Sequence, residues 1–154
     1  MPKPLKRHIS LQPLSHEHHH GLLLSWKIRE GLKRGIEPAR IKRYTDWFWE
    51  KHLRQHFEFE EAYIFPILGK KDKMVKRAKK EHSRLRRLFT AQERVNINLS
   101  LIEEELVAHI RFEERILFNE IQKNASEEQL VLLEKIHQEK QNAETWEDEF
   151  WKKK

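Results

Sequence analysis

Apolar residues recur every third or fourth position along most of the chain, which is the period of an amphipathic helix. In the first such stretch this face includes Leu14, His18, Gly21, Ser25 and Ile28. The pattern predicts five helices. They cover about residues 15–33, 38–66, 72–96, 100–123 and a last segment from Ser126 that carries Leu130, Leu133, Ile136, Trp146 and Phe150.

Residues that favour helix ends support these boundaries, because their side chains can accept hydrogen bonds from the first free backbone N–H groups. The predicted N-terminal caps are Ser15, Asp72 and the capping boxes Ser100/Glu103 and Ser126/Gln129. The connections between the helices are short, so sequential helices should be antiparallel neighbours. We therefore predict an all-α fold, an up-down-up-down four-helix bundle with an additional C-terminal helix.

The predicted organisation has three parts. Residues 1–14 contain three prolines and no helical period, so we expect an extended N-terminal arm. Residues 15–124 form the bundle, and residues 125–154 form a C-terminal helix packed on it or extending from it.

Composition agrees with the all-α class and narrows the available chemistry. The 154 residues include only four Gly and five Pro, and no cysteine, which excludes disulfides, thiolate metal sites and cysteine nucleophiles. Histidine and carboxylate remain as metal ligands. No apolar run approaches the ~20 residues of a membrane helix and no signal peptide is recognisable, so we expect a cytoplasmic protein without membrane contact.

A basic stretch between Lys70 and Lys80 raises the alternative of nucleic-acid binding, in a chain with net charge +6. A run of like charges on an amphipathic helix is usually a solvated face, and no aromatic residues interrupt this one. Nucleic acid is therefore not the expected partner.

The strongest signal for a site is a ten-residue repeat. His56 to Phe65 and His109 to Phe118 share the pattern H-[apolar]-x-F-E-E-x-x-[apolar]-F. On a helix, the His and the first Glu of each copy lie one turn apart on the same face, so His56 pairs with Glu60 and His109 with Glu113.

These two pairs continue apolar stripes. A buried carboxylate is unfavourable unless it is paired or binds a metal, so the pattern requires an explanation. The expected stripe residues are Trp49, Leu53, Ile64 and Ile67 around the first copy and Ile102, Leu106, Ile116 and Leu117 around the second.

The first and third helices also match each other, through Glu17-His18 and Glu81-His82. With the repeat, they predict a metal site whose ligands are His18, His56, Glu60, His82, His109 and Glu113. Imidazole and carboxylate ligands suit iron, manganese or zinc.

The sequence gives weaker support for the other histidines and acids near this site as metal ligands. One His-x-x-x-Glu pair alone would carry little weight, because glutamate is abundant in this chain. His52 and Glu105 each precede a candidate ligand by one turn and are possible outer partners. We expect His16, His19 and His20 to be neighbours of the ligand His18, and His8 and His137 to be solvated.

Over residues 14–122 the sequence resembles the hemerythrin-like, or HHE cation-binding, domain. The resemblance rests on residues 17–22, on 56–66, on Glu81-His82 and on 109–118. It implies a non-heme di-iron centre, oxo- or hydroxo-bridged, with bridging carboxylates from Glu60 and Glu113 and terminal imidazoles from the four histidines. Members of this family reversibly bind O2, or store or sense iron, O2 or NO.

Two positions depart from the oxygen carriers of that family. Arg86 stands where they have a second His one turn after the third-helix ligand, and a guanidinium cannot bind a cation. We expect Arg86 to lie near the metal or to reach an acid such as Glu58 or Glu114. Their last acid would correspond to Glu114, whereas the internal repeat selects Glu113.

The predicted function is thus metal binding, with sensing or storage of iron, O2 or NO. The alternative is a di-iron or other metal-dependent oxidoreductase or hydrolase. No nucleophile motif or phosphate-binding loop supports an enzyme, so a binding protein is the preferred interpretation.

Overall fold

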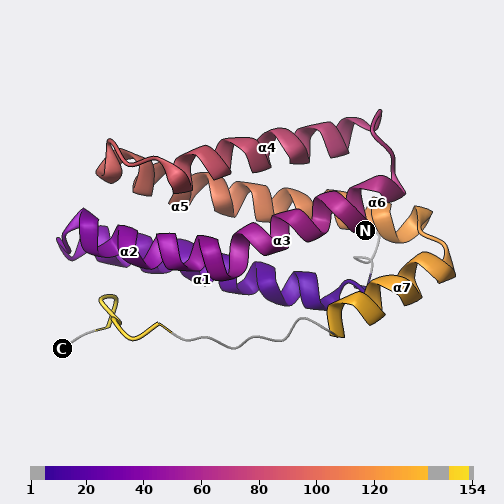
Figure 1. Ribbon diagram of the computed structural model, residues 1–154, viewed down its shortest axis with the longest axis horizontal. Helices are drawn as coiled ribbons and strands as arrows, with labels where there is room; N and C mark the ends of the chain where they lie inside the picture. Colours follow the sequence, from indigo (N-terminus) through magenta and orange to yellow (C-terminus); the bar gives the residue numbers. More distant parts are fainter. Residues whose placement is uncertain (1–5, 139–145, 153–154) are drawn as a thin grey trace, which may run out of the picture.

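The computed structural model describes residues 6–138 and 146–152, except the side chains of residues 137 and 138. All regular structure in these ranges is helical, which confirms the all-α class. The helices form four columns, separated by the connections after Lys33, Ile67 and Thr90. Figure 1 shows these columns side by side, and the chain reverses direction at each connection. None of the helices in the described part is both long and apolar enough to cross a membrane.

Two of the four columns are single helices, α1 (Gln12–Lys33) and α4 (Lys73–Thr90). The other two are built from several consecutive segments. The second column contains α2 (Pro38–Phe48), η1 (Trp49–Leu53), α3 (Arg54–Phe59), η2 (Glu60–Ile64) and η3 (Phe65–Ile67). The fourth column contains α5 (Val95–Phe112), η4 (Glu113–Leu117) and α6 (Phe118–Asn124), and α7 (Glu127–Gln138) follows it.

The segments η1, η2 and η4 are π-helical turns, in which a backbone N–H bonds to the carbonyl five residues earlier. Two of them begin at the glutamates of the repeat. The Phe65 N–H donates to the backbone carbonyl of Glu60, and the Phe118 N–H donates to the backbone carbonyl of Glu113. The extra residue in each turn rotates the following side chains. Ile116 is consequently 47% exposed while Leu117 and Phe118 are fully buried, which corrects the expectation that Ile116 continues the apolar stripe.

Two predicted helix starts are confirmed and two are wrong. The Asp72 carboxylate accepts hydrogen bonds from the N–H groups of Met74 and Val75, and Ser126 and Gln129 exchange the two bonds of a capping box. However, α1 begins at Gln12 instead of Ser15, so the N-terminal arm is shorter than predicted. Ser100 lies inside α5, because that helix begins just after Arg94, whose φ of 53° is left-handed.

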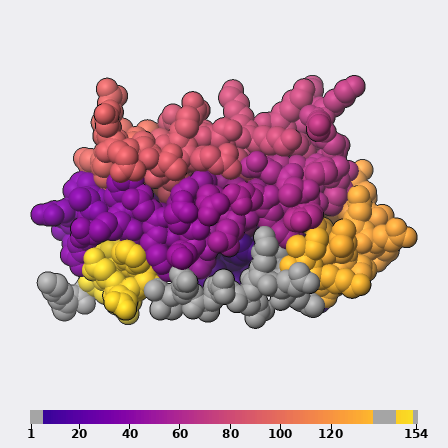
Figure 2. Space-filling view, viewed as in Figure 1, coloured from indigo at the N-terminus to yellow at the C-terminus, as the bar shows by residue number. Residues whose placement is uncertain are grey.

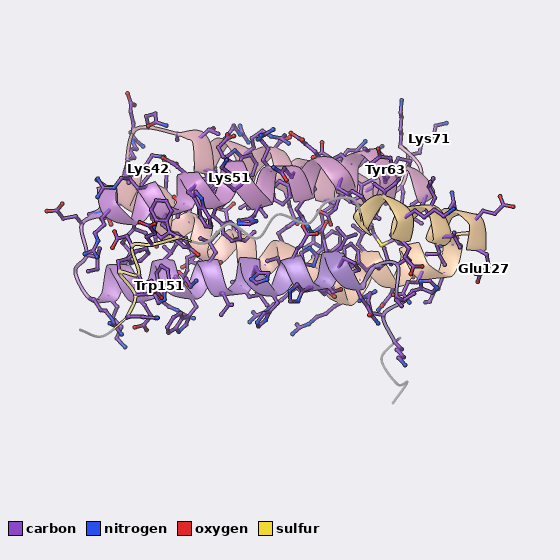
Figure 3. The ribbon with its side chains drawn as sticks, turned by 60° about the horizontal axis from the view of Figure 1, so that its bottom comes forward. Lys42, Lys51, Tyr63, Lys71, Glu127 and Trp151 are labelled. Carbon is purple, nitrogen blue, oxygen red and sulfur yellow. The ribbon has the colours of Figure 1, made fainter. Side chains whose placement is uncertain are left out.

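The C-terminal part also differs from the prediction. Trp146 to Lys152 contain a turn and no helix, and the side chain of His137 and residues 139–145 lie outside what the structure describes. Phe150 and Trp151 are buried, and Lys27 Nζ lies 4.0 Å above the Trp151 ring. Figure 2 shows this segment in yellow against the first two helical columns, and Figure 3 labels Trp151 there. Figure 3 also shows Lys71, in the basic stretch, pointing away from the bundle.

The apolar core is divided into two clusters. One includes Leu24, Phe57 and Leu85, and the other includes Leu14 and Ile64. Along each column, a candidate ligand lies between members of the two clusters, as His18 does between Leu14 and Leu24. The fold therefore encloses a polar layer between two apolar ones.

Candidate metal centre

The structure brings together all six residues that the sequence singled out. Each helical column contributes one imidazole, and the second and fourth columns each add a carboxylate. None of the six is more than 3% exposed: His18, His56, Glu60, His82, His109 and Glu113. Glu114, the alternative to Glu113, is partly exposed and lies outside this group.

Each of the two carboxylates contacts imidazoles from different columns. Glu60 Oε1 lies 3.3 Å from His56 Nε2 and 3.2 Å from His82 Nε2. Glu113 Oε1 lies 2.9 Å from His18 Nε2 and 3.3 Å from His109 Nε2. The carboxylates therefore occupy the centre of the layer.

The six residues divide into two groups of four, and within each group the potential ligand atoms lie within 4.8 Å of one another. His18 and His56 belong to one group, and His82 and His109 to the other. Glu60 and Glu113 belong to both. This is the arrangement expected of two adjacent sites bridged by two carboxylates.

The internal repeat is also visible in three dimensions. Exchanging His18 with His82, His56 with His109 and Glu60 with Glu113 maps the site onto itself. The longer imidazole–carboxylate distances agree under this exchange, with 3.8 Å for His18–Glu60 and 3.7 Å for His82–Glu113. Two sites related in this way have equivalent ligands.

A second set of carboxylates holds the outer nitrogens of the four imidazoles. The Nδ1 atoms of His18 and His82 lie 2.7 and 2.8 Å from Glu114 and Glu61, which follow the central glutamates in sequence. The Nδ1 atoms of His56 and His109 lie 3.1 and 2.8 Å from Glu17 and Glu81, which precede the other two histidines. With Nδ1–H donated outward, an imidazole that loses its second proton directs the lone pair of Nε2 at the centre.

Sequence reasoning missed these four outer partners, although the paired residues Glu17-His18, Glu81-His82 and both Glu-Glu pairs were the signal. Neither of the two partners that it did suggest lies at one of these four Nδ1 atoms. Glu105 forms a bidentate pair with Arg84, at 3.0 and 3.1 Å. His52 packs against the rings of Trp47 and Phe48, because the π-turn η1 alters the helical phase before His56.

Arginines contact three of the outer carboxylates. Arg7 Nη2 lies 3.3 Å from Glu114 Oε2, Arg77 Nε lies 2.9 Å from Glu81 Oε2, and Arg86 Nη2 lies 3.6 Å from Glu61 Oε2. The Arg86 side chain is 40% exposed. Its partner is Glu61, and not Glu58 or Glu114 as the sequence predicts. The guanidinium therefore pairs with the carboxylate that holds His82 Nδ1, and it lies outside the layer of the six candidate ligands.

The N-terminal arm reaches the same network from the end of the bundle. Arg7 donates to the backbone carbonyl of Glu114 at 2.6 Å and to the Gln122 side chain at 2.8 Å. His8, expected to be solvated, is half-buried and lies 2.8 Å from Ser10 Oγ. The arm therefore positions Glu114 and, through it, His18.

Aromatic rings cover the imidazoles. The Phe57 ring stacks on His82 with centroids 3.8 Å apart, and Phe118 stacks on His18 at 5.2 Å. Such contacts restrict imidazole rotation and keep water from the inner nitrogens. His16, His19 and His20, in contrast, are exposed on α1.

Without a metal, the buried charges must neutralise one another. Burial lowers the pKa of His82, but the carboxylates of Glu113, Glu60 and Glu61 outweigh it and raise that pKa to about 10. Burial raises the pKa of Glu113, but the imidazoles of His109, His18 and His82 lower it well below its usual range. The metal-free site therefore contains protonated imidazoles around an ionised carboxylate.

Several of the inner atoms have no hydrogen-bond partner although they are buried, which suits metal ligands. They are the Nε2 atoms of His56, His82 and His109, both carboxylate oxygens of Glu60, and Glu113 Oε2. Ligands about 2.0–2.2 Å from one ion are typically about 3 Å apart, close to the 2.9–3.3 Å found here. The residues present therefore fit a pair of metal ions.

Comparison with known proteins supports this interpretation for most of the site. A family model described as the Hemerythrin HHE cation binding domain matches residues 10–100. The match includes His18, His56, Glu60 and His82 and ends before His109 and Glu113. Neither the curated proteins nor the solved structures include a match to this chain.

The metal-free protein should keep His82 protonated well above neutral pH. Stability from a raised imidazole pKa is fully present below the ordinary value of 6.5 and is lost as the pH rises through about 10. We expect the His82 ring to be charged at pH 8 in an NMR titration, and the Glu113→Gln variant to lower its pKa. Titration of His82 near 6.5 in the parent protein would contradict the charge balance described above.

Proposed function

Because the chain belongs to the hemerythrin HHE cation-binding domain family, we propose that it binds two metal ions between its helical columns. The proposed ligands are His18, His56, Glu60, His82, His109 and Glu113. The observation that carries this proposal is the convergence of buried imidazole nitrogens and carboxylate oxygens on one layer of the core, most of them without a hydrogen bond.

We propose iron as the native metal, in a non-heme di-iron centre, with manganese or zinc as the alternatives. Imidazole nitrogen and carboxylate oxygen suit all three metals, and the absence of cysteine removes the ligand that most favours zinc. Shared oxygens from Glu60 and Glu113 support two ions instead of one, because each carboxylate belongs to both groups.

We further propose that the centre binds or senses O2 or NO, or stores iron. An iron pair supplies reversible redox chemistry toward diatomic molecules, and each ion would have coordination positions that the protein does not fill. The protein itself would hold the four imidazoles in place through their outer carboxylates. Phe57, Phe118 and the two apolar clusters would exclude bulk water from the centre.

The two equivalent groups distinguish this chain from an oxygen carrier. Each group has two imidazoles, because Arg86 replaces the additional His that the resemblance leads one to expect. A symmetric centre gives neither ion an obvious preference for the diatomic ligand. We therefore favour sensing or storage over O2 transport.

Metal content tests the proposal directly. Protein loaded with Fe2+ should contain about two ions per chain, and removing a ligand of either group should lower the content of both, since the bridging carboxylates are shared. We expect His56→Ala and His109→Ala to lose most of the iron in elemental analysis. The control is His19→Ala, an exposed histidine next to His18, which should retain it. Full iron content in both ligand variants would contradict the di-metal site.

The outer carboxylates can be tested separately. Glu61→Gln should weaken metal binding about 10–100-fold, because the His82 Nδ1–H then has a neutral amide as its acceptor in place of a carboxylate. Arg86→Ala should have a smaller effect in the same direction. The measurement is competition against a chelator, together with urea unfolding of the metal-free protein to separate binding from folding.

Matched controls come from the same two helical columns. Glu58→Gln removes an exposed carboxylate that pairs with Arg54, and Arg87→Ala removes an exposed guanidinium beside Arg86. Neither control should change metal affinity. Equal affinities for Glu61→Gln and Glu58→Gln would mean that Glu61 does not position His82.

A further inference from the structure

A pair of histidines on the outer face of α1 has no role in the buried centre. His16 and His20 are both exposed and lie one helical turn apart, while His18 between them points into the core. Their Nε2 atoms are 3.2 Å apart and their ring centroids 4.8 Å apart. In the metal-free protein one Nε2–H donates a hydrogen bond to the other Nε2, so both rings turn the same nitrogen toward the space between them.

This separation matches that of two nitrogens bound to one ion. An ion about 2.0–2.1 Å from each nitrogen places them about 2.9 Å apart at a right angle and about 3.4 Å apart at the tetrahedral angle. The observed 3.2 Å lies between these values. Because both histidines are on one rigid helix, little ordering is needed when an ion binds.

We propose that His16 and His20 form a second metal site, on the surface of α1 and independent of the core centre. Both protein ligands are imidazoles and no carboxylate is among them. The site should therefore prefer Cu2+, Ni2+ or Zn2+, and bind Fe2+ and Mn2+ more weakly, in the order that nitrogen ligands give these metals. Water would complete the coordination.

The sequence around the pair reads His16-Glu17-His18-His19-His20, which has the H-E-x-x-H spacing of helical zinc sites. In hydrolases with that spacing, the Glu acts as a general base at the metal. Here Glu17 Oε2 lies 3.1 Å from His56 Nδ1, so its carboxylate belongs to the core network. In the described part of the chain, groups of three or more potential ligands occur only in the core. The surface site is consequently a binding site and not a hydrolase centre.

The test is a titration of the iron-loaded protein with Zn2+ in competition with a chromophoric chelator. We expect the parent protein and His19→Ala to bind one Zn2+ that His16→Ala and His20→Ala do not bind. All of these substitutions are at exposed positions, so circular dichroism should show unchanged folding. The two core groups should keep their iron in the His16→Ala, His19→Ala and His20→Ala variants.

The outcome separates this site from the core centre. His56→Ala should lose iron and still bind the surface Zn2+, whereas His16→Ala should retain iron and lose that Zn2+. If His16→Ala and His20→Ala bind Zn2+ as the parent does, the surface site is wrong. Loss of Zn2+ binding in only one of them would also contradict it, because that ion would then have other ligands.

Discussion

The structure depends on placing two carboxylates, Glu60 and Glu113, in the middle of a helical core. Both are fully buried between two apolar clusters, where an isolated carboxylate would be strongly unfavourable. The fold surrounds them with one imidazole from each helical column. Protonated imidazoles balance the charge when metal is absent, and metal ions would replace those protons when they bind. Metal binding and folding therefore both depend on the interactions of these imidazoles and carboxylates.

The outer network explains how the imidazoles are held and why Arg86 is present. Each Nδ1 has its own glutamate, and three of these glutamates have an arginine beside them. Arg86 stabilises Glu61 in its charged form, since the pKa of Glu61 is lowered first by His82 and further by Arg86. Arg86, which stands at the position of a missing ligand in the sequence, thus stabilises the carboxylate that holds the proposed ligand His82.

Much of this site could be predicted from the sequence, because the repeated His-x-x-x-Glu spacing depends only on helical geometry within one column. The all-α class and the caps at Asp72 and Ser126 are local features and could be predicted as well. The π-turns could not, because they depend on tertiary packing, and they account for the misplacement of Ile116 and His52. The pairing of outer carboxylates with histidines of other columns also requires the fold. So does the docking of Trp151, which replaces the predicted helix with a turn.

In the proposed centre, the two groups hold adjacent ions that share Glu60 and Glu113. X-ray absorption of the iron-loaded protein at the iron edge measures this most directly. The structure predicts nitrogen and oxygen neighbours only, together with a second iron within about 4 Å. Iron without a metal neighbour at that distance would contradict the shared carboxylates, whatever the total iron content.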